Sequence, residues 1–121
     1  ISMNKLELAW STYEFYTLEI TDHEYAHVQL VKEINETFPF LNPADKKSLQ
    51  SEYDRQHKCL FTLYKKHLDS ISDLISLNQT LVDVPPEREV DITSLITLKN
   101  VTATLMQEMK IYKKEIDELF G

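Results

Sequence analysis

Turn-forming residues are scarce in this sequence, and their scarcity limits the fold more than any other feature. The 121 residues include a single glycine, at position 121, and four prolines, which stand at positions 39, 43, 85 and 86. Sheets and loop-rich folds need glycine and proline at many turns, so a chain that concentrates them at two internal places has few connections. We therefore predict an all-α fold in which three long helices are joined at those two places.

Residues that begin and end helices stand at the borders of these three segments. Asn4 is a capping residue for the first helix, and Pro39 ends it. The pair Asn42-Pro43 supplies an N-cap followed by proline at the first helical position, so the second helix should run from Pro43 to about residue 78. Pro85-Pro86 interrupts the chain again, and Asp91 can cap the third helix.

Each segment carries apolar residues at the three-to-four spacing of a helix that buries one face. The face of the second helix is the broadest, so we expect it to pack against two neighbours. In the third helix the spacing is that of a heptad ladder. This ladder consists of Leu95, Leu98, Thr102, Leu105, Met109, Tyr112, Ile116 and Leu119.

Helices of matched length joined by short turns predict an antiparallel up-down-up bundle of three long helices. One alternative is a break of the first helix near Thr21, which with Glu24 forms a capping box and would give four helices. Another is that the heptad ladder is the seam of a coiled-coil dimer. We prefer the internal bundle, because all three helices carry an apolar face.

The domain limits follow from the same pattern. Residues 4–121 are expected to form a single domain, and residues 1–3 to be a cloning remnant. Acidic residues crowd the last turn of the third helix, where the helix dipole favours positive charge. We therefore expect the chain to be a fragment of a longer protein, either a monomer or a helical extension of adjacent domains. These acids are Glu115, Asp117 and Glu118.

Charge and composition narrow the classes of partner. The formal net charge of −7 repels phosphate backbones, so nucleic-acid binding is disfavoured. No apolar run reaches the length of a membrane helix, so no membrane insertion is expected. The lone Cys59 excludes an intrachain disulfide and favours a cytoplasmic location. A chain without a glycine-rich loop offers no phosphate site, and we expect no cofactor.

The stretch His23-Glu24-Tyr25-Ala26-His27 matches H-E-x-x-H, a motif of zinc peptidases. Two histidines four residues apart can both ligate zinc from one helix face while the glutamate activates a water molecule. Glu52 is the downstream carboxylate that could complete such a site. A peptidase of this class also places a strand beside the metal helix, and the sequence predicts no strand. We therefore expect no metal and no enzymatic activity, with a zinc-dependent hydrolase or metal-binding bundle as the alternative.

A structural use of the same residues is preferred. If the first helix is unbroken, Glu24 and His27 fall at consecutive core positions. Counting residues from the two turns places them at the level of residues on the other two helices. We predict a polar layer whose buried groups bond to one another and fix the register of the bundle. Its members would be Glu24, His27, Gln56, His57 and Tyr112. Elsewhere in the core, His67 is expected to be hydrogen-bonded.

Aromatic and aliphatic residues on the first helix exceed what one core-facing stripe can hold. Because exposed aromatic residues favour partner binding, we predict that some of them form a contact surface for another protein. The predicted surface consists of Tyr13, Tyr16, Tyr25 and Leu30.

The stretch KLELAWSTYEFYTLEI, residues 5–20, resembles the first helix of a spectrin-type repeat, in the placement of Leu8, Trp10 and Glu14. The second tryptophan of that family is absent, and Tyr53 or Tyr64 is its nearest substitute. The resemblance implies a non-enzymatic cytoskeletal or scaffold module that binds other proteins. A syntaxin-type N-terminal three-helix domain has the same layout and would imply a regulatory role in membrane trafficking.

Overall fold

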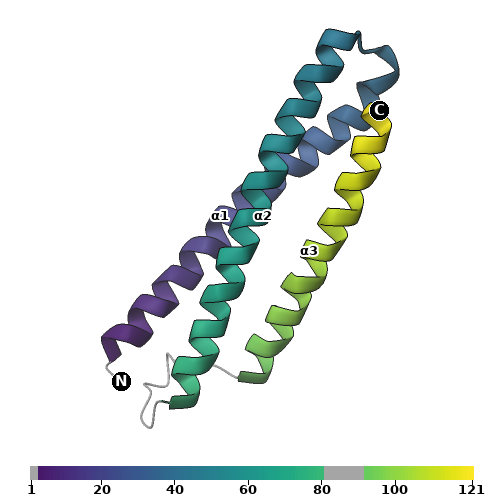
Figure 1. The fold of residues 1–121 in the computed structure, drawn as a ribbon. Coiled ribbons are helices and arrows are strands. Elements are labelled where there is room, and N and C mark those ends of the chain that lie inside the picture. The colour runs from purple at the N-terminus through teal and green to yellow at the C-terminus, as the bar shows by residue number, and fades with distance from the viewer. Residues whose placement is uncertain (1–2, 81–91) are drawn as a thin grey trace.

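The computed structural model describes residues 3–80 and 92–121, with side chains for residues 5–79 and 92–121. Three α-helices make up nearly all of this: α1 spans Met3–Thr37, α2 spans Pro43–Thr80 and α3 spans Ile92–Phe120. They run up, down and up the molecule, and α2 contacts both α1 and α3 (Figure 1). The predicted all-α fold of three long helices is confirmed.

The first turn forms where the sequence predicts it. A short 3₁₀ helix, η1 (Phe38–Phe40), contains Pro39 and follows α1 directly. The side chain of Asn42 then caps α2, since its Oδ1 accepts a hydrogen bond of 2.8 Å from the backbone N–H of Asp45. At the other turn, the predicted cap Asp91 lies outside the described residues, as does the side chain of Asn4.

The alternative of a broken first helix is wrong. Helix α1 continues through Thr21, whose hydroxyl donates to the carbonyl oxygen of Thr17 one turn earlier at 2.9 Å. A hydroxyl bonded back to its own helix is not capping a new one. The capping box read from Thr21 and Glu24 therefore does not form.

The core consists of three clusters spaced along the bundle, each with residues from all three helices. Early residues of α1 meet late residues of α2, and late residues of α1 meet early ones of α2, as antiparallel packing requires. The same holds between α2 and α3. The first cluster contains Leu6, Ile71, Leu74 and Leu95; the second contains Ile20, Leu60, Tyr64 and Met106; the third contains Leu30, Ile34, Tyr53 and Ile116.

The predicted heptad ladder of α3 is wrong along one of its two edges. Leu95, Thr102 and Ile116 are buried, but Leu105, Tyr112 and Leu119 are 36–42% exposed, and Met106 is buried instead. The reason is that α3 packs chiefly against α2 and far less against α1. The buried stripe therefore turns toward α2, and the residues on the α1 side of the ladder stay open to solvent.

None of the three described helices combines the length and the apolar character that crossing a membrane requires.

Candidate functional site

The residues of the H-E-x-x-H motif each bond to a different partner. His23 Nδ1 donates to the backbone carbonyl of Glu19 at 2.8 Å, and His27 Nδ1 lies 3.4 Å from Gln56 Oε1. The carboxylate of Glu24 accepts a hydrogen bond from the hydroxyl of Tyr64. The candidate third ligand, Glu52, accepts from Arg55 and from Gln56 on its own helix.

The two histidines also face different surfaces. His23 lines a shallow depression between α1 and α2, whereas His27 lines a groove between α1 and α3. Within residues 3–80 and 92–121, no three histidine, cysteine, aspartate or glutamate side chains gather in a way that could hold a metal ion. The alternative set His23, Glu24, His27 and Glu52 is therefore not brought together.

We expect added zinc to leave the thermal midpoint of unfolding unchanged, because a metal that binds only the folded state would raise it. The measurement is a melting curve with zinc, with a chelator and with neither. The His27→Ala variant is the control. A zinc-dependent rise in the midpoint that disappears in His27→Ala would contradict this expectation and restore the metal-binding alternative.

The predicted polar layer is found in part. His27 contacts Gln56 as predicted. His57 is buried between the rings of Tyr53 and Phe61 of its own helix, but its Nδ1 has no hydrogen-bond partner among the described residues, so it does not bond to the layer through that atom. Glu24, however, bonds to Tyr64, which was not among the predicted members of the layer. A buried phenol needs a hydrogen-bond partner, and that requirement was the signal available in the sequence. The last predicted member, Tyr112, accepts from the amide of Asn35 at 3.5 Å instead.

Burial shifts the ionisation of this layer. The pKa of Glu24 is raised by burial, which disfavours the carboxylate. The pKa of His27 is lowered by burial, an effect that the hydrogen bond with Gln56 opposes in part. Burial is also the main cause that lowers the pKa of His57, with nearby Lys113 acting in the same direction.

A second polar contact lies between the first and second clusters. His67 is buried, and its Nε2 lies 3.1 Å from the hydroxyl oxygen of Thr17, so the predicted hydrogen-bonded core histidine is confirmed. The Thr17 hydroxyl donates its proton to the carbonyl of Tyr13, so it accepts from His67. His67 therefore carries its proton on Nε2, and its buried Nδ1 has no partner.

The predicted contact surface on α1 does not form one exposed stripe. Leu30 is only 7% exposed and belongs to the third core cluster, so its expected exposure is wrong. Tyr13 is half-buried, with its ring stacked between Trp10 and His67. Tyr16 is half-buried beside Phe15, and Tyr25 is exposed. Leu30 faces the core because the buried stripe of α1 drifts around the helix toward its C-terminal end.

An open apolar groove lies between α1 and α3, where these two helices fail to close on each other. Its volume is about 380 Å³. Val28 and Val31 form the wall on α1, and Tyr64 is the lining residue that α2 contributes. The complete lining, which we call the α1–α3 groove, consists of His27, Val28, Val31, Tyr64, Leu105, Glu108, Met109 and Tyr112.

The three exposed residues of the predicted heptad ladder, together with Val101, extend this groove along α3. Positions 101, 105, 108, 112, 115 and 119 follow one another at steps of four and three, so they share one helix face. Four of these six positions hold a large apolar side chain that is at least one-third exposed. These are Val101, Leu105, Tyr112 and Leu119. An apolar strip of this length on a solvent-facing surface is typical of an interaction site.

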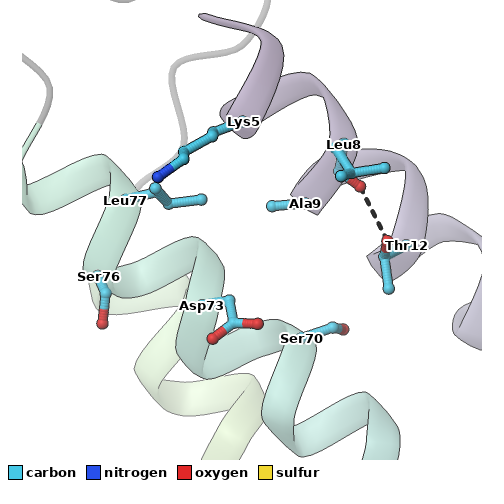
Figure 2. Close-up of a pocket in the computed structure, with 8 residues that line it drawn as sticks. All are labelled: Lys5, Leu8, Ala9, Thr12, Ser70, Asp73, Ser76 and Leu77. Carbon is cyan, nitrogen blue, oxygen red and sulfur yellow. Dashed lines mark hydrogen bonds between the residues drawn. The ribbon is translucent and has the colours of Figure 1, made fainter. Parts of the chain in front are cut away.

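A second groove, of about 390 Å³, lies between the start of α1 and the end of α2. Figure 2 shows Lys5, Leu8 and Thr12 of α1 facing Asp73 and its neighbours on α2. Two of the hydroxyls here are turned back on their own helices, since Thr12 donates to the carbonyl of Leu8 and Ser70 to that of His67. Their protons are therefore already used within the helices.

No protein-family model, curated protein or solved structure matches this chain. The resemblance of residues 5–20 to a spectrin-type repeat stays a prediction.

Proposed function

We propose that this chain is a non-enzymatic helical module that binds another protein through the α1–α3 groove. The single observation that carries this proposal is the exposed apolar face of α3, which runs beside Val28 and Val31 of α1 without being covered. Isolated exposed apolar residues are ordinary, but aligned ones beside a groove mark binding surfaces. An intracellular scaffold role, which the spectrin-type resemblance implies, stays a further prediction.

Leu105→Ser is expected to abolish partner binding while leaving the fold intact. Leu105 lines the groove and is 38% exposed, so its removal takes apolar area from the binding surface and little from the core. The matched control is Ile96→Ser, which is also on α3 and partly exposed. Nine residues separate the two positions, which places them about 180° apart around the helix.

The measurement is affinity capture from a native extract, with the wild type and both variants as bait and mass spectrometry as the readout. Proteins retained by the wild type and by Ile96→Ser, and lost by Leu105→Ser, support the proposal. Identical capture by all three baits would contradict it. A Tyr25→Ser bait tests the other predicted surface: if this variant alone loses the partner, binding occurs on the outer face of α1 and the groove proposal is wrong.

A further inference from the structure

We infer that the occupant of the α1–α3 groove is an amphipathic helix of another protein, with basic residues flanking its apolar stripe. This inference rests on the proposed function and adds the chemical class of the partner. It follows from two features of the groove: the helical spacing of its apolar residues and the sign of the charges around it.

The shape of the surface fits a helix. The exposed apolar residues of α3 on this side share one helix face at steps of four, seven and seven, with Glu108 and Glu115 between them; they are Val101, Leu105, Tyr112 and Leu119. The 18 steps from the first to the last cover about 27 Å at 1.5 Å per residue, which is five turns. A helix laid alongside can place its own residues at i, i+3, i+4 and i+7 between them, as in other helix-in-groove complexes. The hollow between α1 and α3 is thus the place of a fourth helix in a bundle.

The charges next to the groove are acidic. Glu108 lines it directly, and Glu115 lies on the same face of α3 two turns further on. Glu24, one turn before Val28 on α1, accepts a hydrogen bond from the hydroxyl of Tyr64, which is itself a lining residue. Among the residues that the structure describes, no lysine or arginine lines the groove. The nearest basic residue on α1 is Lys32, one turn beyond Val28 and exposed.

Within the part of the chain that the structure describes, no ion pair joins these carboxylates to a lysine or arginine. Glu24 is also half-buried, where a carboxylate without a positive partner is unfavourable. A lysine or arginine of the incoming helix would supply the missing positive partner. The same carboxylates would disfavour binding of an acidic helix. A second copy of this chain carries a net charge of −7 and meets the groove with the wrong sign.

The test uses two synthetic helical peptides of about 18 residues, a length set by the rise per residue. Both carry leucine at the same i, i+3, i+4 and i+7 positions. One has lysine and the other glutamate at the flanking positions, and binding of each fluorescent peptide is followed by anisotropy. We expect the lysine peptide to bind at least about tenfold more tightly, with a preference that weakens at high salt.

Three variants locate the effect. The double variant Glu24→Gln/Glu108→Gln should reduce the preference to about twofold or less, since each glutamine keeps the shape of the side chain and loses the charge. Glu33→Gln is the matched control, because Glu33 is exposed and lies about 140° around α1 from Val28. It should keep the full preference. Leu105→Ser should weaken binding of the lysine peptide.

Several outcomes would overturn the inference. Equal affinity for the two peptides, or a preference that survives in Glu24→Gln/Glu108→Gln, would show that charge does not select the partner. Dimerisation that is lost in Leu105→Ser, measured by light scattering, would make a second copy the occupant. If neither peptide binds while capture from the extract still depends on Leu105, the inference fails and the proposed function stands. If capture is also independent of Leu105, both fail.

Discussion

Replacing Ile71 with alanine is expected to lower the free energy of unfolding by about 2–5 kcal/mol, the range measured for such truncations in well-packed cores. Ile71 is 0% exposed and lies in the first cluster, where it packs with Leu6 of α1 and Leu95 of α3. The cavity left by the truncation would therefore lie at a point where all three helices meet, and no single side chain can move in to fill it.

Urea denaturation followed by circular dichroism measures this change, because a shift of the midpoint at constant slope reports stability alone. Ile111→Ala is the control: Ile111 is 62% exposed, so its truncation should change the free energy of unfolding by less than about 0.5 kcal/mol. If Ile71→Ala cost less than about 1 kcal/mol, Ile71 would not be at the centre of a packed core.

Acidification from about pH 7 to about pH 5.5, the range in which histidine takes up its proton, is expected to destabilise the bundle strongly. The pKa of His27, His57 and His67 is lowered in each case chiefly by burial, from an ordinary value of 6.5. Below pH 6.5 these histidines bind protons in the unfolded chain but stay neutral in the folded chain. The stability present above pH 6.5 is therefore lost as the pH falls from 6.5 through the pKa values of the folded chain. Each histidine adds at most about 1.4 kcal/mol per pH unit.

The charges that face these histidines do not reverse the sign. Next to His57, Lys113 opposes protonation, while Asp54 and Asp117 favour it less strongly than burial disfavours it. For His67, a second proton would be placed on Nδ1, which is buried without an acceptor. The raised pKa of Glu24 acts in the opposite direction, because the stability that this group contributes is lost as the pH rises. That loss begins near 4.5, the ordinary pKa of a glutamate, which lies below the pH range in which histidine titrates.

Denaturant unfolding at several pH values measures how steeply the free energy of unfolding changes with pH. His67→Phe should flatten this dependence, since the ring keeps its place beside Tyr13 and no longer titrates. His23→Gln is the matched control, because His23 lies half-buried at the edge of α1, where its Nδ1 donates to the carbonyl of Glu19 on the same helix. Stability that is constant, or that increases, as the pH falls over this range would show that these histidines are not held neutral by the fold.

The ends of the helices could be predicted from the sequence because each depends on a local signal. Pro39 cannot continue a helix and Asn42 can cap one, and neither effect needs knowledge of distant residues. The pairing of His27 with Gln56 was also predictable, since it requires only counting equal distances from a turn between two helices in contact.

The seam of α3 and the groove could not be predicted in the same way. A heptad ladder shows that one face of α3 is apolar, but not how that face is shared between two neighbours. Leu105 and Tyr112 would be buried if α3 lay equally against α1 and α2. They are exposed because α3 lies closer to α2, which is a property of three helices together.

The central place of α2 has a consequence for how a ligand could enter. Both core interfaces run along α2, whereas the groove lies on the side where α1 and α3 face each other across a gap. An incoming helix can therefore dock without separating core side chains that pack against one another. Its binding free energy is not reduced by an opening step, because the receiving surface is preorganised.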